Sequence, residues 1–310
     1  MFSVTRNQMI RIPVVPGEAD GLVIAVWYGV PPEPATAVDV FVCGATYDHR
    51  YATRRPGRGV LSYAEMTLAA GRAVLAVDRL GTGASSRPPA RDVTLRAQAR
   101  AVHQVITWAR QGHTRVNLIG HSLGSAIATL VAGTWPDAPD TLVLTGWYPH
   151  AMPSPEALAL LETGIKPAAC DPVLADLGYD DLEYLTTVDG IRGPAFHLPD
   201  ADPVAVADDD ACRSVVSAVE MKEVQELSVP GPGHPAHRVR CQTLFVLGGR
   251  DLLFPANSAA AVIAAEKAWF TSAPLYAVVI PGAPHSMALD PVAAGKSFAA
   301  INSRLTNGER

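Results

Sequence analysis

Residues Val116–Leu130 read VNLIGHSLGSAIATL, and this stretch decides the fold of the chain. It opens with a largely apolar run that is typical of a buried strand, and the small residues after Gly124 are typical of a closely packed helix. Between them, Gly120-His-Ser-Leu-Gly124 fits the G-x-S-x-G pattern of a sharp strand-to-helix turn. A serine in an ordinary turn is the alternative. The strand before Ser122 and the helix after it favour a nucleophile projected from the carboxyl end of a sheet.

Similar apolar runs recur at Gly21–Val30, Ala37–Cys43, Ala73–Val77, Val116–Gly120, Thr141–Thr145, Gln242–Leu247 and Leu275–Ile280. Most are continuous rather than alternating, which is the pattern of strands covered on both faces. Helical segments are predicted at Ser62–Ala70, Thr94–Arg110, Gly124–Gly133, Pro255–Phe270 and Met287–Arg304. This alternation of strands and helices predicts an α/β protein with a parallel sheet between two layers of helices.

Residues 151–238 differ in composition from the rest of the chain. They hold 16 acidic and 5 basic side chains, a local net charge of −11 in a chain whose net charge is −5. They also interrupt the alternation of strands and helices, and Pro and Gly residues lie near both ends of the segment. We therefore predict that residues 151–238, called the insertion below, interrupt a core domain formed by residues 1–150 and 239–310.

The overall composition is that of a globular chain of 310 residues, 48% hydrophobic and 18% charged. No apolar run approaches the roughly 20 residues needed to cross a bilayer, and the N-terminus lacks the features of a signal peptide. There is no long basic stripe, so we expect neither a nucleic-acid nor a membrane partner. The four cysteines lack metal-ligand spacing, so we expect reduced thiols in a cytoplasmic protein without a metal site (Cys43, Cys170, Cys212 and Cys241).

A nucleophilic serine needs a base, and His285 has the most suitable position among the histidines. It lies in the loop Ile280-Pro-Gly-Ala-Pro-His285, directly after the last predicted strand and before a helix. Five other histidines are disfavoured by their places in helices, turns, the elbow itself or the exit of the insertion (His103, His113, His121, His234 and His237). Three more remain candidate neighbours of the site, but no strand end selects them as the base (His49, His150 and His197).

The carboxylate that orients this imidazole is predicted to be Asp251. It lies at the tip of the strand in Leu244–Asp251, where it can accept the second imidazole N–H and stabilise the imidazolium. The alternatives Asp171, Asp180 and Asp181 belong to the acidic insertion, whose carboxylates we expect to face water. Asp251 is therefore the only strand-end carboxylate that the sequence pattern offers.

With Ser122, Asp251 and His285 in this order, the sequence resembles the α/β-hydrolase fold superfamily over nearly its whole length. The resemblance implies a mostly parallel eight-stranded sheet flanked by helices, with a lid inserted after the sixth strand. Asp78–Ser85, which reads DRLGTGAS, also resembles the family's D-x-x-G-x-G-x-S turn. Read alone, this turn is half of a dinucleotide fingerprint. The third glycine is missing and Pro88-Pro89 blocks the helix that would hold a pyrophosphate, so we reject that interpretation.

The oxyanion hole is the part of the site where the sequence departs from the family. The family usually has His-Gly after its third strand, whereas Phe41–Asp48 reads FVCGATYD, with Cys43 in place of the histidine. The resemblance implies that the backbone N–H groups of Ala45 and Leu123 bind the oxyanion. A backbone donor does not depend on the side chain before it, but the choice between Ala45 and Thr46 stays open.

Together these residues predict a cofactor-independent serine hydrolase that acts on a carboxylic ester or thioester of a small, largely apolar molecule. An acyltransferase, a C–C bond hydrolase or a lyase with the same triad is the first alternative, and a non-catalytic ligand-binding protein is the second. Epoxide hydrolases and dehalogenases of the superfamily are disfavoured because they carry an aspartate at the elbow.

Two groups of side chains are assigned less specifically. The apolar residues of the insertion are expected either to line the acyl pocket or to form a small core of their own (Leu158, Leu160, Leu161, Leu174, Leu177, Tyr179, Leu182, Tyr184 and Leu185). Four arginines after the oxyanion loop are expected to be solvated or, as the alternative, to meet an anionic group at the mouth of the site (Arg50, Arg54, Arg55 and Arg58).

Overall fold

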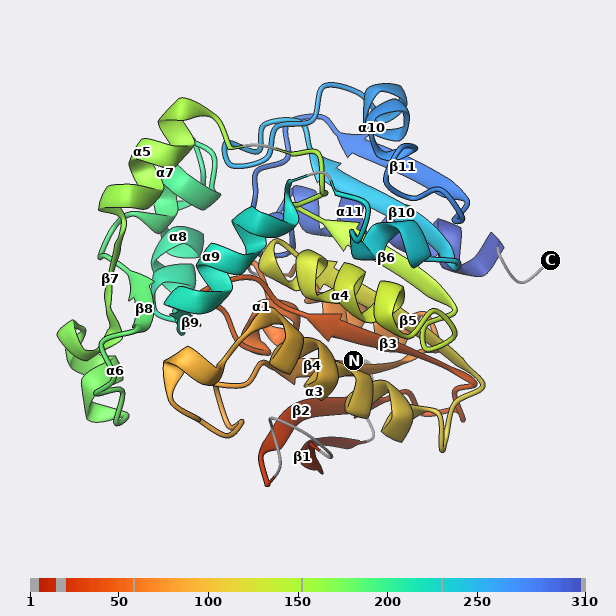
Figure 1. Ribbon diagram of the computed structural model, residues 1–310, viewed down its shortest axis with the longest axis horizontal. Coiled ribbons are helices and arrows are strands. Elements are labelled where there is room, and N and C mark those ends of the chain that lie inside the picture. The colour runs from red at the N-terminus through yellow and green to blue at the C-terminus, as the bar shows by residue number, and fades with distance from the viewer. Residues whose placement is uncertain (1–5, 15–20, 58, 152, 230, 308–310) are drawn as a thin grey trace.

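The structure, a computed structural model, describes residues 6–14, 21–57, 59–151, 153–229 and 231–307. Its centre is an 8-stranded sheet in the order β1-β2-β4-β3-β5-β6-β10-β11 (Figure 1). The strands are β1 (Arg6–Pro13), β2 (Val23–Val30), β3 (Ala37–Val42), β4 (Ala73–Asp78), β5 (Arg115–His121), β6 (Thr141–Thr145), β10 (Gln242–Gly248) and β11 (Leu275–Ile280). β2 pairs antiparallel with β1 and β4, and every pairing from β4 to β11 is parallel. The predicted mostly parallel, eight-stranded sheet is confirmed.

Seven of these strands were predicted, and the edge strand β1 was not. In β1 the exposed Arg11 stands between the half-buried Ile10 and the buried Ile12. A strand that covers the core with one face alternates in this way and lacks the continuous apolar run of β3 to β6. The five-residue strand β6 lies where it was predicted, with all five residues buried.

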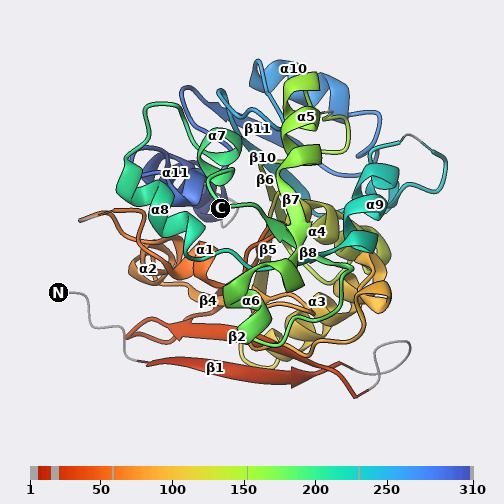
Figure 2. The same cartoon turned by 90° about the vertical axis from the view of Figure 1, so that its left-hand side faces the viewer.

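Helices cover both faces of the sheet (Figure 2). α3 (Leu95–Ala109) and α4 (Leu123–Thr134) lie on one face, and α2 (Tyr63–Ala69) and α11 (Ala293–Asn307) lie on the other. The short α1 (Arg50–Thr53) follows β3, and α10 (Ala259–Glu266) packs beside β11. No helix in the described parts of the chain is long and apolar enough to cross a membrane.

The predicted helices differ from the observed ones mainly at their ends, and the predicted segment Pro255–Phe270 is observed as the shorter α10. The predicted segment Thr94–Arg110 is α3 with its two capping residues, and the Thr94 hydroxyl accepts the Ala97 N–H. The predicted segment Met287–Arg304 instead divides into a 3-10 turn, η4 (Met287–Leu289), and α11. The break occurs at Asp290, whose carboxylate accepts the N–H groups of Val292 and Ala293 and so starts a new helix.

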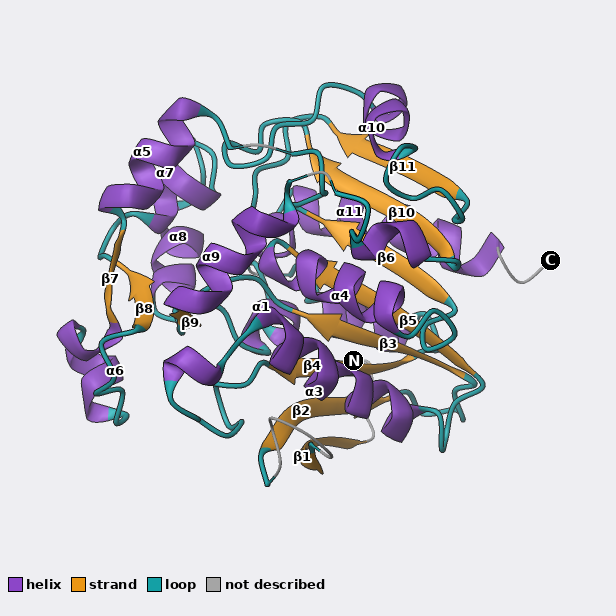
Figure 3. Ribbon diagram, viewed as in Figure 1, coloured by secondary structure: helices purple, strands orange, loops and turns teal. Residues whose placement is uncertain are grey.

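The insertion lies over the carboxyl ends of the parallel strands, at the left of Figure 1 and toward the viewer in Figure 2. It is a small mixed unit of short helices and a 3-stranded sheet in the order β7-β8-β9 (Figure 3). Its elements are α5 (Pro155–Thr163), β7 (Ile165–Pro167), η2 (Ala168–Cys170), α6 (Pro172–Asp176), β8 (Tyr184–Thr187), α7 (Arg192–Phe196), α8 (Pro203–Asp210), β9 (Val216–Ser217), α9 (Ala218–Leu227) and η3 (Pro235–Arg238).

The expectation that the acidic side chains of the insertion face water is wrong for three of them. Asp171, Asp209 and Glu220 are at most 1% exposed. A buried carboxylate persists where a cation compensates its lost hydration, and each of the three has such a partner. Asp171 pairs with Lys166 and Arg213 inside the insertion. The partners of the other two carboxylates lie beside the site described next.

Candidate active site

Ser122 lies at the junction of β5 and α4 in a strained backbone conformation, with φ at +52°. Its N–H donates to Thr145 O on the neighbouring strand at 2.8 Å, which fixes the turn on the sheet. The turn has no space for larger neighbours. A Cβ at Gly120 would lie 2.5 Å from Gly124 O, and a Cβ at Gly124 would lie 2.1 Å from Val42 O. The glycines therefore permit the close approach that holds Ser122 in this conformation.

Asp251 and His285 meet at the ends of the adjacent strands β10 and β11. His285 Nδ1 lies 2.8 Å from Asp251 Oδ2, and both residues are buried. Asp251 Oδ1 also accepts the N–H groups of Leu253 (2.8 Å) and Phe254 (3.0 Å), which fix the carboxylate. Because a carboxylate only accepts, the imidazole proton resides on Nδ1 and Nε2 is left with a free lone pair. The geometry is that of a histidine base held by an acid.

The loops that carry these two residues are joined to each other. Gly249 N–H donates to Ile280 O, and Arg250 N–H donates to Ala283 O, both at 3.0 Å. A Cβ at Gly248 would lie 2.5 Å from Ala283 O, so the loops approach too closely for any larger residue there. This contact fixes the position of the Asp251 carboxylate relative to the His285 ring.

Ser122 and His285 line the same small cavity, which has a volume of about 80 Å³ and lies between the core and the insertion. The core contributes Ala45, Thr46, Tyr47, Ser122, Leu123, Trp147, Leu253, Phe254 and His285. The insertion contributes Leu161, Ile165, Thr187, Phe196, Val216, Met221 and Val224. The structure thus brings together all five residues predicted for the site, in surroundings that are mostly apolar.

The two residues whose amides were predicted to bind an oxyanion, Ala45 and Leu123, also line this cavity. Within the described residues, neither the Ala45 N–H nor the Leu123 N–H has a hydrogen-bond partner. Cys43, which stands where the family has a histidine, is buried, and burial raises the pKa of its thiol to about 12. It is therefore a neutral thiol. Thr46 has a strained backbone with φ at +58°, so the loop around Ala45 is sharply bent.

His121 was disfavoured as the base because it lies in the elbow itself, and it is not among the residues that line the cavity. Its ring is buried, stacks on Tyr51 with 4.4 Å between ring centroids, and lies 4.9 Å from the His285 ring. Its Nδ1 meets the Thr145 hydroxyl at 3.1 Å. Burial, followed by the nearby His285, lowers the pKa of His121 well below its usual value. A neutral imidazole therefore packs beside the His285 ring, a contact that no sequence motif indicated.

A second network next to the cavity was also missed from the sequence. The Tyr47 hydroxyl donates to Asp209 Oδ2 at 3.0 Å and accepts from Ser286, the residue after His285, at 2.7 Å. Arg192 pairs with Asp209 Oδ1 at 3.0 Å and is fully buried. This network connects the insertion to Tyr47, two residues after Ala45, and to the loop that carries His285.

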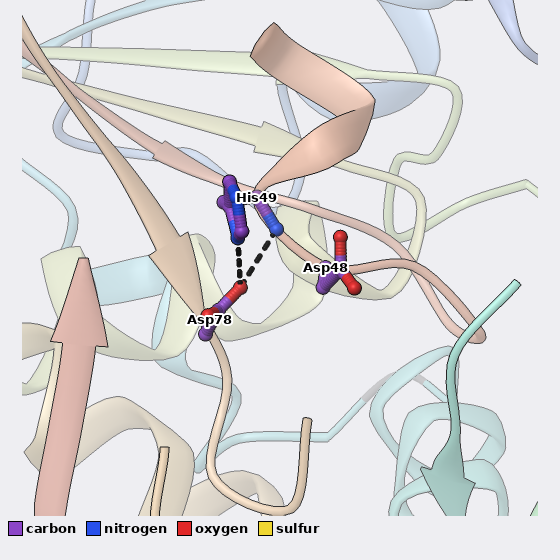
Figure 4. A group of neighbouring side chains, drawn as sticks. All are labelled: Asp48, His49 and Asp78. Carbon is purple, nitrogen blue, oxygen red and sulfur yellow. Dashed lines mark hydrogen bonds and ion pairs between the residues drawn. The ribbon is translucent and has the colours of Figure 1, made fainter. Parts of the chain in front are cut away.

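Asp48, His49 and Asp78 form the one cluster in the described residues with the composition of a metal site (Figure 4). The chain's own donors already occupy its oxygens. Asp78 accepts His49 N–H and Nδ1 on one oxygen and Ala84 N–H on the other, while Arg50 binds both oxygens of Asp48. Burial opposes protonation of His49, but its hydrogen bond to Asp78 outweighs this and raises its pKa. The cluster serves to close the DRLGTGAS turn beneath the site.

The remaining sequence assignments divide as follows. Of the nine apolar insertion residues, Leu161 lines the cavity, while Leu158, Leu177 and Leu182 are exposed. Leu174, Tyr179 and Tyr184 are buried in the hydrophobic core, and Leu160 and Leu185 pack against core residues. The arginines after the oxyanion loop bind nearby acidic residues. Arg50 pairs with Asp48, Arg54 with Asp208 and Arg55 with Glu65, whereas Arg58 lies outside the described residues.

Comparison with known proteins places this site in a family. The Alpha/beta hydrolase family matches residues 40–294. No curated protein matches the sequence significantly. Among solved structures, an E-2-(acetamidomethylene)succinate hydrolase is 18% identical with a TM-score of 0.61, covering 96% of this chain and 98% of that chain. An esterase from Thermogutta terrifontis is 16% identical with a TM-score of 0.61, covering 97% and 98%. A bromoperoxidase from Bacillus anthracis is 17% identical with a TM-score of 0.63, covering 96% and 98%.

At these identities the structural likeness shows the fold alone, and the similar structures differ in their described activities. The family match is broader evidence, because it spans most of the chain and includes Ser122, Asp251 and His285. The chain belongs to the α/β hydrolase family.

Proposed function

We propose that the protein is a cofactor-independent serine hydrolase that cleaves a carboxylic ester or thioester of a small, largely apolar molecule through an acyl-enzyme on Ser122. The observation that carries this proposal is the strained turn that places Ser122 at the wall of a cavity also lined by His285. Membership of the α/β hydrolase family supports a hydrolase, and an esterase is among the similar structures.

In the proposed reaction, His285 Nε2 takes the proton of the Ser122 hydroxyl while the oxygen attacks the substrate carbonyl. Asp251 holds the ring through Nδ1 and stabilises the imidazolium that forms. The backbone N–H groups of Ala45 and Leu123 donate to the oxyanion of the tetrahedral intermediate. The imidazolium then protonates the leaving group, and a water activated by the same imidazole hydrolyses the acyl-enzyme.

The cavity supports a short acyl group. Its volume of about 80 Å³ is well below the roughly 300–1,000 Å³ of pockets that enclose drug-sized ligands. Its wall on the insertion side is apolar, with Leu161, Phe196 and Met221 among the residues that face it. We therefore propose that the insertion acts as a lid that selects short apolar acyl chains, and that its net charge of −11 disfavours polyanionic substrates.

A fluorophosphonate probe followed by peptide mapping tests the nucleophile. We expect labelling at Ser122, and loss of turnover by on the order of 10⁴–10⁶-fold in Ser122→Ala. Ser125→Ala is the matched control, because Ser125 is buried three residues further on and, in the described structure, its hydroxyl bonds to the backbone of Thr145. This variant should keep the label. Labelling at another serine, or full turnover by Ser122→Ala, would overturn the proposal.

A series of p-nitrophenyl esters from acetyl to octanoyl tests the acyl group. We expect kcat/KM to be highest for acetyl to butyryl esters and to fall for longer chains, because the cavity does not hold them. An octanoyl preference would contradict the size argument. Release of a new ester on addition of an alcohol, in place of the acid, would identify an acyltransferase. No turnover and no labelling would identify a ligand-binding protein.

A further inference from the structure

Two fully buried arginines reach residues 44–46, called the oxyanion loop below, from different parts of the chain. Arg79 follows β4 in the core, and Arg192 begins α7 in the insertion; both side chains are 0% exposed. Each guanidinium divides its two arms in the same way. One arm pairs with a carboxylate of the insertion, and the other donates to the oxyanion loop.

Arg79 holds the peptide group that carries the proposed oxyanion donor. Its Nη1 pairs with Glu220 Oε1 at 2.5 Å, and its Nη2 donates to Gly44 O at 3.2 Å and Val215 O at 3.0 Å. Gly44 C=O and Ala45 N–H belong to one planar trans peptide, in which they point in opposite directions. Fixing the carbonyl therefore fixes the N–H. The nearby guanidinium also polarises the peptide, which makes the N–H a stronger donor.

Arg192 holds the next residue of the loop. Its Nη2 pairs with Asp209 Oδ1 and its Nη1 donates to the Thr46 hydroxyl, both at 3.0 Å. Thr46 is one of the two described non-glycine residues with positive φ, and Ser122 is the other. A residue in this region persists only where its surroundings hold it there. The bond from Arg192 supplies such a constraint.

We propose that Arg79 and Arg192 are positioning residues for the oxyanion loop, and that the insertion supplies the counter-ions that hold them in place. This inference rests on the proposed function and deepens it. Glu220 and Asp209 give the insertion a part in turnover itself, in addition to the selection of the acyl group. The same geometry assigns the N–H of Ala45, rather than that of Thr46, as the oxyanion donor of the loop. Arg79 donates to Gly44 O, which belongs to the same peptide group as the Ala45 N–H.

Substitution of arginine by lysine distinguishes the ion pair with the insertion from the hydrogen bond to the oxyanion loop. A lysine ammonium keeps the ion pair with the insertion carboxylate. Unlike a planar guanidinium, it cannot also bond to the oxyanion loop at the same time. We expect Arg79→Lys to lower kcat for p-nitrophenyl acetate by about 10–100-fold with KM changed less than about threefold. Complete removal of an oxyanion donor costs about 10²–10³-fold, and displacement of one should cost less.

The matched control is Arg72→Lys. Arg72 is also a buried arginine that binds a carboxylate, Asp39, and a second acceptor, Asn302, but these lie in the core away from the oxyanion loop. We expect Arg72→Lys to keep kcat within about twofold of the wild type, at a loss of thermal stability similar to that of Arg79→Lys. Equal losses of kcat in the two variants would overturn the proposal, because the effect would then be one of general stability.

A transition-state analogue provides a readout that a merely structural role would not move. A trifluoromethyl ketone adds to the serine and places an oxyanion in the hole, whereas a neutral alcohol such as 1-butanol places none there. We expect Arg79→Lys to weaken binding of the ketone in parallel with kcat and to leave the affinity for 1-butanol unchanged. Unchanged ketone affinity would overturn the proposal.

Thr46 provides a second test that leaves both ion pairs intact. Thr46→Val keeps the shape of the side chain and removes the hydroxyl that accepts from Arg192 Nη1, so kcat should fall by about tenfold. Thr46→Ser keeps the acceptor and should restore most of the loss. If Arg79→Lys does not fold, this pair decides the proposal, and equal kcat in the two Thr46 variants would overturn it. Failure of the proposed function would differ, because Ser122→Ala would then remain active.

Discussion

Two buried histidine–aspartate pairs with the same nitrogen–oxygen distance lie in the two parts of the molecule. In the core, His285 Nδ1 lies 2.8 Å from Asp251 Oδ2, and in the insertion His197 Nε2 lies 2.8 Å from Asp209 Oδ2. All four side chains are at most 2% exposed. By distance and burial alone, either pair is a candidate for a base and its orienting acid.

The two pairs differ in what surrounds them. The second oxygen of Asp251 accepts backbone N–H groups, whereas the second oxygen of Asp209 binds the Arg192 guanidinium. The His285 ring lines the cavity with Ser122. The His197 ring does not line it, and its Nδ1 is buried without a partner among the described residues. A histidine–aspartate pair therefore indicates a base only where the second ring nitrogen faces a nucleophile. A pair whose carboxylate also binds an arginine indicates a structural role.

The largest expected effect separates the two histidines. His285→Ala should lower kcat by on the order of 10⁴-fold or more, because it removes the proposed base. His197→Ala should lower kcat by less than about tenfold, since it only loosens the network around Asp209. Steady-state kinetics with p-nitrophenyl acetate measures both. If His197→Ala cost as much as His285→Ala, the comparison would fail and the insertion pair would take part in the chemistry.

The stability of the fold should depend more on the buried Asp209 than on the exposed Asp208. Asp209→Asn leaves Arg192 buried without a counter-ion, and breaking a buried ion pair in this way costs about 3–5 kcal/mol. Asp208→Asn is the matched control, because the exposed pair of Asp208 with Arg54 should contribute at most about 1 kcal/mol. Chemical denaturation measures the free energy of unfolding of both variants. Equal losses would show that the buried pair is not what holds the insertion.

The core and its site were largely predictable because their determinants are local. Gly120-His-Ser-Leu-Gly124 fits a pattern of five residues, and Asp251 and His285 each lie within a few residues of the end of an apolar strand. Parallel strands bring their carboxyl ends to one edge of a sheet, so positions at strand ends are informative about contacts. The same rule would have drawn attention to Arg79, which follows β4 directly.

The acidic composition of residues 151–238 is evident from the sequence, but the contacts of the insertion were not predictable. Its strands have two to four residues, too few to give a period. Its key pairs join distant positions, such as Arg79 with Glu220 and Thr46 with Arg192, and no short-range pattern encodes them. An excess of acidic residues predicted solvated carboxylates. Buried arginines with these carboxylates as partners reverse that expectation for Asp209 and Glu220.

Acid should weaken the ion pair between Asp209 and Arg192. Burial raises the pKa of Asp209, but Arg192 and then His197 outweigh it and lower the pKa from 3.8 to about 2. The pair therefore stabilises the fold fully above pH 4 and loses its contribution as the pH falls toward 2, on the order of 2 kcal/mol in total. Denaturation at pH 6 and at pH 3 measures this. The loss of stability in acid should be smaller in Asp209→Asn, and an equal loss would assign it to other groups.

A third buried acid, Glu266, contrasts with Asp209 because it has no cationic partner among the described residues. Glu266, at the end of α10, is 0% exposed; one oxygen accepts His150 N–H, and the other has no partner in the described chain. Burial raises its pKa from 4.5 to about 8, the opposite of the shift at Asp209. The folded protein thus keeps a proton that the unfolded chain loses near pH 4.5, so the free energy of unfolding falls as the pH rises from about 4.5 to 8.

Glu266→Gln removes this charge while keeping an oxygen that can accept His150 N–H. We expect the variant to be more stable than the wild type at pH 8 by on the order of 4 kcal/mol, and the two to converge below pH 4.5, where the carboxyl is neutral in both the folded and the unfolded state. Thermal melting across this range measures the difference, with a rise of about 6 °C at pH 8. Glu162→Gln, on the exposed face of α5, should show no such trend. A variant that was less stable than the wild type at pH 8 would mean that Glu266 is ionised and paired in the folded protein, as Asp209 is.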